Sequence, residues 1–308
     1  MANKNMSGKN RKERRDLQIQ LRNRYIKLQD RFFNTATSIF SWEFDGLSKY
    51  YNELVSNEIE RLLFANGMAT IFIDEYDGIL KVGAVAGTSK IGQYRQYVEW
   101  TAVMADGTNI RGLNDKNAVI IYNNKSKSPT RMMIEDDIRN MIDTDVSLSQ
   151  HIKAVRVPFV FSGNENDMLT FKTIFQSVSD GEPVVFTDGN IGLQQDTFKV
   201  WNSDVNYKGD KLMMLYEAFE NRVFTMLGIQ SNRIDKKAQL GMTEVDKNDD
   251  VILVNFYAFK SERERARGLV EEVLGVKCSL NINEYLAKQN HKEENKTEGG
   301  SEDGKVYD

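Results

Sequence analysis

Two long amphipathic segments constrain the fold of this chain more than any other feature of its sequence. Residues 128–154 predict a helix with Ser128 as N-cap and Pro129 as first helical residue. In residues 210–227 apolar side chains recur at steps of four and three, a short heptad-like seam: Leu212, Tyr216, Phe219, Val223 and Met226. The two segments flank a small insert, and a long polar loop follows them. A hairpin of two such helices buries little surface by itself and needs neighbours.

The first of these helices carries one apolar stripe, with further apolar residues near its start that offer a second contact. The stripe consists of Ile134, Ile138, Met141, Leu148 and Ile152. The remaining surface is expected to be solvated or to face another subunit, and it includes Glu135, Asp136, Asp137, Asp143 and Asp145.

The rest of the chain alternates between helical and β-rich periods. Helices are expected at 17–42, 47–66 (with Gly67 at its end) and 249–275. Strands are expected at 68–74, 79–87, 96–105 and 117–124, as a small, mostly antiparallel sheet beside the first two helices. Residues 155–203 read as a small α+β insert, 276–282 as a final strand, and the polar residues from about 286 onward as a disordered tail.

Composition excludes several classes of protein. The net charge is −4, which argues against a broad DNA-binding surface but leaves local basic patches possible. One cysteine and two histidines cannot form a Cys/His zinc site or an internal disulfide. No apolar run approaches the length of a membrane-spanning helix, and the N-terminus lacks the apolar stretch of a signal peptide.

No motif names an enzyme, a cofactor or a metal site. The chain has no phosphate-binding loop of the Walker type, and the glycines of 83–92 follow a strand without opening a helix. Asp74 and Asp77 could bind Mg²⁺ in a nucleic-acid enzyme, but a hairpin turn explains them better. His151 is expected to cap or pack near a helix end rather than to activate a nucleophile.

Two segments of the sequence carry basic residues that favour contact with nucleic acid. Residues 1–15 contain six basic side chains against one acidic one: Lys4, Lys9, Arg11, Lys12, Arg14 and Arg15 against Glu13. With almost no apolar residues, this segment is expected to be flexible, as a solubilising tail or as an arm that contacts nucleic acid. Lys236 and Lys237 lie in a polar loop that is long for a compact domain, and by themselves they would suit a solvated surface.

The order and spacing of several short motifs resemble one protein family. The motifs are "VIIYNN", "PVVF", "FKV", "MLGI" and "DKKAQLGMTEVDKNDD". In order and spacing they are similar to the portal proteins, also called upper collar or head–tail connector proteins, of small short-tailed phages. The likeness extends from about Trp42 to Leu280 and is closest from Ala118 to Ile252.

The resemblance implies a fold that is mainly α with α+β parts, and a ring of twelve subunits around a channel for double-stranded DNA. The implied parts are a basic arm (1–15), wing segments (16–127 and 248–285), stem helices (128–154 and 204–227), a clip (155–203), a channel loop (228–247) and a tail (286–308). The ring would lie in the virion at one capsid vertex, and would be assembled in the host cytoplasm. Its implied partners are the major capsid protein, a separate packaging ATPase, a packaging RNA, and a lower collar or tail protein.

The resemblance also implies which side chains meet nucleic acid. Lys236 and Lys237 match a lysine pair of the channel loop, and Lys199 and Lys211 match two further lysines of the lumen. The spacing between Lys199 and Lys211 departs slightly from the family pattern. A non-viral helical scaffold or adaptor that oligomerises is the alternative to a portal protein.

Overall fold

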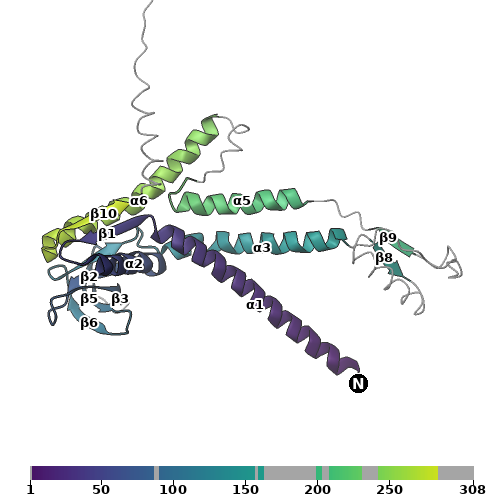
Figure 1. The fold of residues 1–308 in the computed structure, drawn as a ribbon, viewed down its shortest axis with the longest axis horizontal. Coiled ribbons are helices and arrows are strands. Elements are labelled where there is room, and N and C mark those ends of the chain that lie inside the picture. The colour runs from purple at the N-terminus through teal and green to yellow at the C-terminus, as the bar shows by residue number, and fades with distance from the viewer. Residues whose placement is uncertain are drawn as a thin grey trace, which may run out of the picture. The chain divides into compact units, whose positions relative to one another are not determined.

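The computed structural model describes residues 2–86, 90–156, 159–162, 199–202, 208–230 and 242–283. These residues form two compact units. The first contains residues up to Ile142 and from Ala218 onward, and the second contains Asp143–Glu217. Helices α3 (Thr130–Arg156) and α5 (Gly209–Met226) each belong to both units. The chain is helical with a curled sheet, as Figure 1 shows, which confirms the expected fold class at this level.

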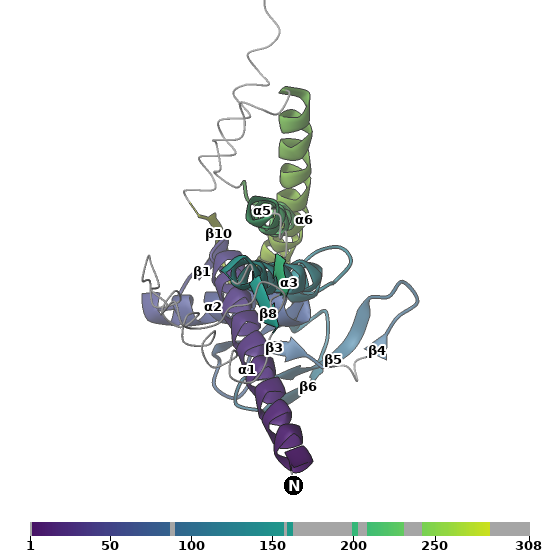
Figure 2. The same ribbon diagram turned by 90° about the vertical axis from the view of Figure 1, so that its right-hand side faces the viewer.

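The sheet of the first unit is antiparallel and contains six strands. They are β2 (Met68–Ile73), β3 (Leu80–Val85), β4 (Lys90–Ile91), β5 (Tyr97–Val103), β6 (Asn109–Leu113) and β7 (Ala118–Tyr122). Their order is β4-β5-β3-β2-β7, and β6 pairs with β5. The hairpin of β4 and β5 projects from the sheet (Figure 2). The expected antiparallel sheet is confirmed, whereas β4 and β6 were not expected.

Strand β2 is the centre of this unit because it is buried on both faces. Ile71 points into one apolar cluster and Phe72 into another, as the period of two in a strand requires. Trp100 belongs to the second cluster. Its Nε1 donates to Thr70 Oγ1 at 2.9 Å, so the indole N–H has a hydrogen-bond partner although the ring is buried.

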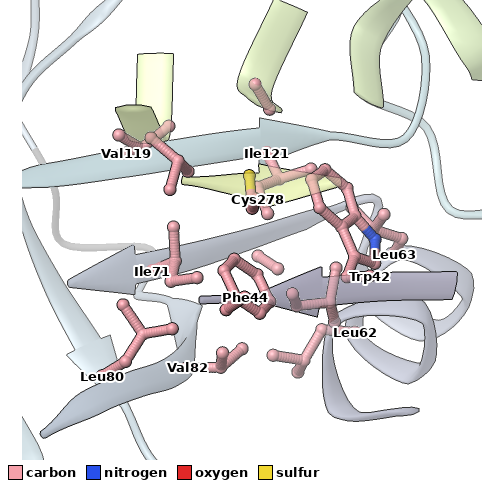
Figure 3. Close-up of a cluster of buried hydrophobic side chains, with 14 residues drawn as sticks. Trp42, Phe44, Leu62, Leu63, Ile71, Leu80, Val82, Val119, Ile121 and Cys278 are labelled. Carbon is pink, nitrogen blue, oxygen red and sulfur yellow. The ribbon is translucent and has the colours of Figure 1, made fainter. Parts of the chain in front are cut away.

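The larger cluster joins the sheet to two helices, α2 (Lys49–Asn66) and α6 (Met242–Leu274), and to a separate two-stranded ribbon. The ribbon pairs β1 (Phe40–Phe44) with β10 (Cys278–Ile282), and Phe44 lies opposite Cys278. Figure 3 shows Trp42 and Phe44 of β1 among the side chains of the sheet and of α2. The ribbon therefore joins the segment that follows α1 to the C-terminal end of the described chain in one core.

The tight turn after α2 explains why a glycine is required there. Gly67 has φ 77° and caps α2 in the left-handed region, as expected from the sequence. A Cβ at this position would lie 2.3 Å from the carbonyl oxygen of Lys127, so no other residue fits without backbone movement. Asn123 N donates to Gly67 O at 2.9 Å, which holds the segment before α3 against the end of α2.

Several expected helix ends were wrong. The first helix, α1, spans Ala2–Thr37 rather than 17–42, because Phe40, Trp42 and Phe44 alternate at the period of a strand and pair with β10. At its other end α1 includes the basic segment, since lysine, arginine and glutamate are good helix formers even without a core to join.

Two further helices begin away from the expected residues. Helix α3 begins at Thr130, one residue after Pro129, the expected first helical residue. Helix α6 begins at Met242, seven residues before the expected start, so the last part of the expected channel loop is helical. Glu244 and Asp246 lie near this N-terminus, where the helix dipole favours negative charge.

A buried ion pair joins the parts of the first unit. Arg263 of α6 donates to Glu60 of α2 from Nε at 2.9 Å and from Nη2 at 2.7 Å. Glu60 also accepts from Trp42 Nε1 at 3.0 Å, and the guanidinium of Arg263 stacks 4.5 Å from the ring centroid of Phe40. Arg263 Nη1 donates to the carbonyl oxygen of Phe259 at 3.1 Å. Both charged groups are almost fully buried and are satisfied mainly by each other.

Arg263→Ala is expected to destabilise the protein by about 3–5 kcal/mol, because it leaves the Glu60 carboxylate buried without its counter-charge. Urea unfolding followed by circular dichroism measures the change. The control is Arg267→Ala, an exposed arginine of the same helix, which should stay within about 0.5 kcal/mol. Equal losses for the two variants would contradict the role given to the buried pair.

Candidate functional site

The helices α3 and α5, which were expected to form the stem, meet in the first unit through a buried acid. Asp137 is only 1% exposed, so its expected place on the helix surface was wrong. Its Oδ1 lies 3.3 Å from Arg222 Nη2 of α5 and has no hydrogen-bond partner among the described residues. The sequence contained a signal: position 137 is three residues from Ile134 and four from Met141, on the face of the apolar stripe.

Burial raises the pKa of the Asp137 carboxyl group, and the neighbouring Asp136 raises it further. The guanidinium of Arg222 opposes both effects but does not cancel them. The surroundings of Asp137 therefore disfavour its charged form relative to a carboxyl group in water.

A second polar contact joins α5 to α1. Glu220 is buried, and its Oε1 lies 2.7 Å from Arg31 Nη1. The Arg31 guanidinium also lies over the rings of Phe32 and Phe224, which pack edge to face at 5.8 Å. The Arg31 side chain, which links α1 to α5, is thus held both by an ion pair and by two aromatic rings.

The heptad-like seam expected on α5 is buried only in part. Val223 is fully buried in the first unit, whereas Leu212, Tyr216, Phe219 and Met226 keep part of their surface exposed. Beside the seam, three further apolar side chains are about half exposed in the second unit: Met213, Met214 and Leu215. Apolar residues surround most of this helix, yet part of that apolar surface faces solvent. Such an exposed apolar surface indicates a site for contact with another protein surface.

In the second unit His151 caps a helix, as expected. Its Nε2 accepts the backbone N–H of Lys208, the residue before α5, at 2.8 Å. The same unit contains a short antiparallel pair of strands, β8 (Phe159–Ser162) and β9 (Lys199–Asn202). Two strands of the expected α+β insert are therefore present, and residues 157–158, 163–198 and 203 of the expected clip lie outside the described residues.

The structure places two of the four expected channel lysines. Lys211 is exposed in the first turn of α5, and Lys199 begins β9 opposite Ser162. Lys236 and Lys237 lie outside the described residues. The described part of the chain therefore brings no lysine cluster together. The basic residues from Lys4 to Arg15 all lie on α1, and of their side chains only that of Arg15 is described, as exposed.

The acidic pair considered for Mg²⁺ belongs to a hairpin turn. Asp74 and Asp77 both form ion pairs with Lys81, at 2.7 Å for Asp77, and their other oxygens accept backbone N–H groups of the turn. These bonds lower the pKa of both carboxyl groups. Elsewhere in the described ranges no group of three or more metal-binding side chains occurs. Nor is any helix there long and apolar enough to cross a membrane.

A family model described as Phage Connector (GP10) matches residues 9–287, nearly the whole chain. The chain belongs to the phage connector family. The expected function, that of a portal protein or head–tail connector, is thereby confirmed, and the non-viral scaffold is the weaker explanation. Portal proteins are structural components, which fits a chain whose sequence offers no catalytic motif.

Solved structures of portal proteins are similar to this connector over most of its length. One, in the portal and tail of native bacteriophage P68, is 12% identical with a TM-score of 0.41, covering 93% of this chain and 97% of that chain. A portal protein of the HK97 family from Corynebacterium diphtheriae is 12% identical with a TM-score of 0.44, covering 82% and 91%. A chain in the neck of a native gene transfer agent particle, computed with C12 symmetry, is 9% identical with a TM-score of 0.46, covering 90% and 86%.

One exposed apolar face of the connector was not expected. On the N-terminal half of α6, Val251, Val254 and Tyr257 face solvent. The sequence carried a signal here too, because "VILVNFYAF" is apolar on more than one side of a helix, more than a single core contact can use.

Asp137→Asn is expected to make the connector more stable at neutral pH, by up to about 1 kcal/mol, because it removes a charge that burial disfavours. Protonation of Asp137 stabilises the native state below the ordinary carboxyl pKa, and this contribution is lost as pH rises through its raised pKa. The advantage of the variant should therefore shrink on acidification. Thermal unfolding between pH 4 and 8 measures it.

The matched control is Asp136→Asn, a neighbour on the same helix that is more accessible to solvent, whose stability should track the unmodified protein across this range. An Asp137→Asn variant that is less stable at pH 7 would show that the pair with Arg222 outweighs the cost of burial.

Proposed function

We propose that this connector forms a ring of twelve copies at one vertex of the capsid, with a central channel for double-stranded DNA during packaging and ejection. Membership of the phage connector family carries the proposal. The exposed apolar side chains of α5 support it, because the described residues of one copy leave part of their surface uncovered. A head-to-tail interface that closes into a ring would cover them in every copy.

In this ring α3 and α5 form the stem, residues 155–203 the clip and the remaining parts the wing. The clip faces the packaging ATPase and later the lower collar or tail protein, and the wing contacts the major capsid protein. The ring resides in the virion after assembly in the host cytoplasm. The connector needs no catalytic residue or cofactor, because the motor supplies the energy for packaging.

The charge of the chain suits a conduit better than a clamp. Duplex DNA carries one negative charge per about 1.7 Å of its axis, so a strongly basic channel would hold it in place. A net charge of −4 per copy, with lysines at 199, 211, 236 and 237, gives weak contacts that ring symmetry repeats. The DNA is then repelled from most of the wall and can slide.

The N-terminal part of α1 serves as a nucleic-acid arm in this proposal. Its six basic residues from Lys4 to Arg15 contact a packaging RNA or the DNA itself through phosphate groups. An arm on a helix presents these charges at a fixed rise of about 1.5 Å per residue.

Lys236→Ala combined with Lys237→Ala is expected to leave folding and ring assembly intact, because the substitutions open no cavity in the described core. The ring loses a belt of positive charge, so heads should package DNA and then lose it. The measurement is DNA retained in assembled heads after packaging stops. The control is the exposed pair Lys116→Ala with Lys125→Ala in the first unit.

Normal DNA retention in the Lys236/Lys237 variant would show that this lysine pair is not a channel contact. Loss of the ring itself would show that the pair lies in a subunit interface instead.

Replacement of the six basic residues of the arm by glutamine should weaken RNA and DNA binding without dissolving the ring. Glutamine keeps helix propensity, so the weaker binding reports charge alone. For duplex DNA the salt dependence should become shallower by about 0.9 in log–log slope for each phosphate that the arm no longer neutralises. Filter binding at several salt concentrations measures it. An unchanged slope would make the arm a solubilising segment.

A further inference from the structure

Three exposed apolar side chains form a stripe along α6. Val251, Val254 and Tyr257 recur at steps of three on one side of the helix and are between 45% and 68% exposed. The opposite side of the same helix is buried through Ile252 and Phe256. These three exposed residues are called the α6 patch below.

Helix α2 presents a second apolar patch in the same unit. Tyr50, Tyr51 and Leu54 are between 46% and 66% exposed, and the two tyrosine rings pack edge to face at 5.7 Å. Farther along α2, Ile59 and Leu63 point into the core, so the helix is anchored while this face stays uncovered. These residues are called the α2 patch.

Each patch is followed along its helix by an ion pair, and the two pairs have opposite order. On α2 the acid comes first: Glu58 pairs with Arg61 through two contacts of 2.6 Å. On α6 the base comes first: Lys260 Nζ lies 3.5 Å from Glu264 Oε1. In both helices about eight residues, or about 12 Å, separate the centre of the patch from the centre of its ion pair.

We propose that the α2 patch of one subunit packs in parallel against the α6 patch of the next subunit in the ring. This register places Tyr51 against Val254, Leu54 against Tyr257 and Arg61 against Glu264, each at the same offset along the chain. Lys260 then faces Glu58 of the neighbour. The inference rests on the proposed ring and adds which surfaces meet in it.

Charge order rules out the competing arrangements of these two helices. In an antiparallel register with the ion pairs aligned, Glu58 would oppose Glu264 and Arg61 would oppose Lys260. Two identical patches packed in parallel would also oppose like charges. Two identical patches packed antiparallel could bring their apolar residues together only by sending the two ion pairs to opposite ends of the contact. Only a parallel contact between an α2 patch and an α6 patch brings the apolar residues together and also places opposite charges against each other.

The two patches provide specificity more than affinity. Exposed ion pairs contribute little, about 0–1 kcal/mol each, but like charges in the wrong register select against it. A stable interface usually buries about 800 Å² on each partner, more than three side chains can supply. The contact between α2 and α6 is therefore one part of the subunit interface, and other surfaces complete it.

Disulfide trapping tests the pairing in the full-length chain. The only native cysteine, Cys278, is buried, and its burial raises the pKa of the thiol to about 11, so it stays unreactive. The variant Tyr51→Cys with Val254→Cys, oxidised as assembled rings, should give a ladder of covalent multimers on a non-reducing gel. Tyr51→Cys with Ser261→Cys is the control, because its second position is displaced by about 10 Å, beyond disulfide reach.

Charge exchange provides the second measurement, on exposed or half-buried residues whose substitution does not open the core. Glu58→Arg with Arg61→Glu should slow trapping about fivefold, and Lys260→Glu with Glu264→Lys should do the same. All four substitutions together should restore the original rate. A fivefold change corresponds to about 1 kcal/mol.

The outcomes separate this inference from the proposed function. Rings without the ladder, a ladder from the control pair alone, or no rescue by the fourfold exchange would overturn the pairing of α2 with α6. An intramolecular disulfide between Val254→Cys and a cysteine introduced within residues 231–241 or 284–308 of the same chain would overturn it as well. Failure of the unmodified protein to form rings would instead contradict the proposed function.

Discussion

The buried pair of Glu60 and Arg263 determines how the first unit is built. It joins α2 to α6 across a long stretch of sequence, fixes the indole of Trp42 on β1, and lies against Phe40. Because each charge is desolvated, each depends on the other, and displacement of either helix would leave one of them unpaired. The pair therefore fixes the relative position of the elements that carry the α2 and α6 patches, which a contact between subunits of a ring requires.

Much of this fold could be predicted from the sequence. In the core elements the spacing of apolar residues and the residues that end a helix or strand indicate the same boundaries. Gly67 ended α2 as expected, and β2, β3, β5 and β7 lie where alternation placed them. The failures occurred where tertiary pairing overrode a local pattern. Phe40 and Trp42 fit the helical spacing of α1 but belong to β1, since β10 supplies a partner that the local sequence does not reveal. The short strand β4 carries too few residues to show a period.

The functional site was less predictable than the fold. Order and spacing of short motifs identified a connector family that the match over residues 9–287 confirms. Asp137 was misjudged because a run of three acids suggested solvent, although its position on the stripe of Ile134 and Met141 indicated burial. The α6 patch was not predicted, because every apolar residue of this helix was assigned to the core of its own subunit. Lys199, Lys211, Lys236 and Lys237 stay predictions about a lumen that only the assembled ring creates.

The mass and symmetry of the purified protein decide whether the connector assembles as a ring of twelve. Native mass spectrometry together with electron microscopy at micromolar concentration measures both on one sample. A hollow ring of twelve copies is expected, with a mass about twelve times the 35.4 kDa of one chain. A protein that stays monomeric under these conditions, or that forms only closed dimers, would contradict it.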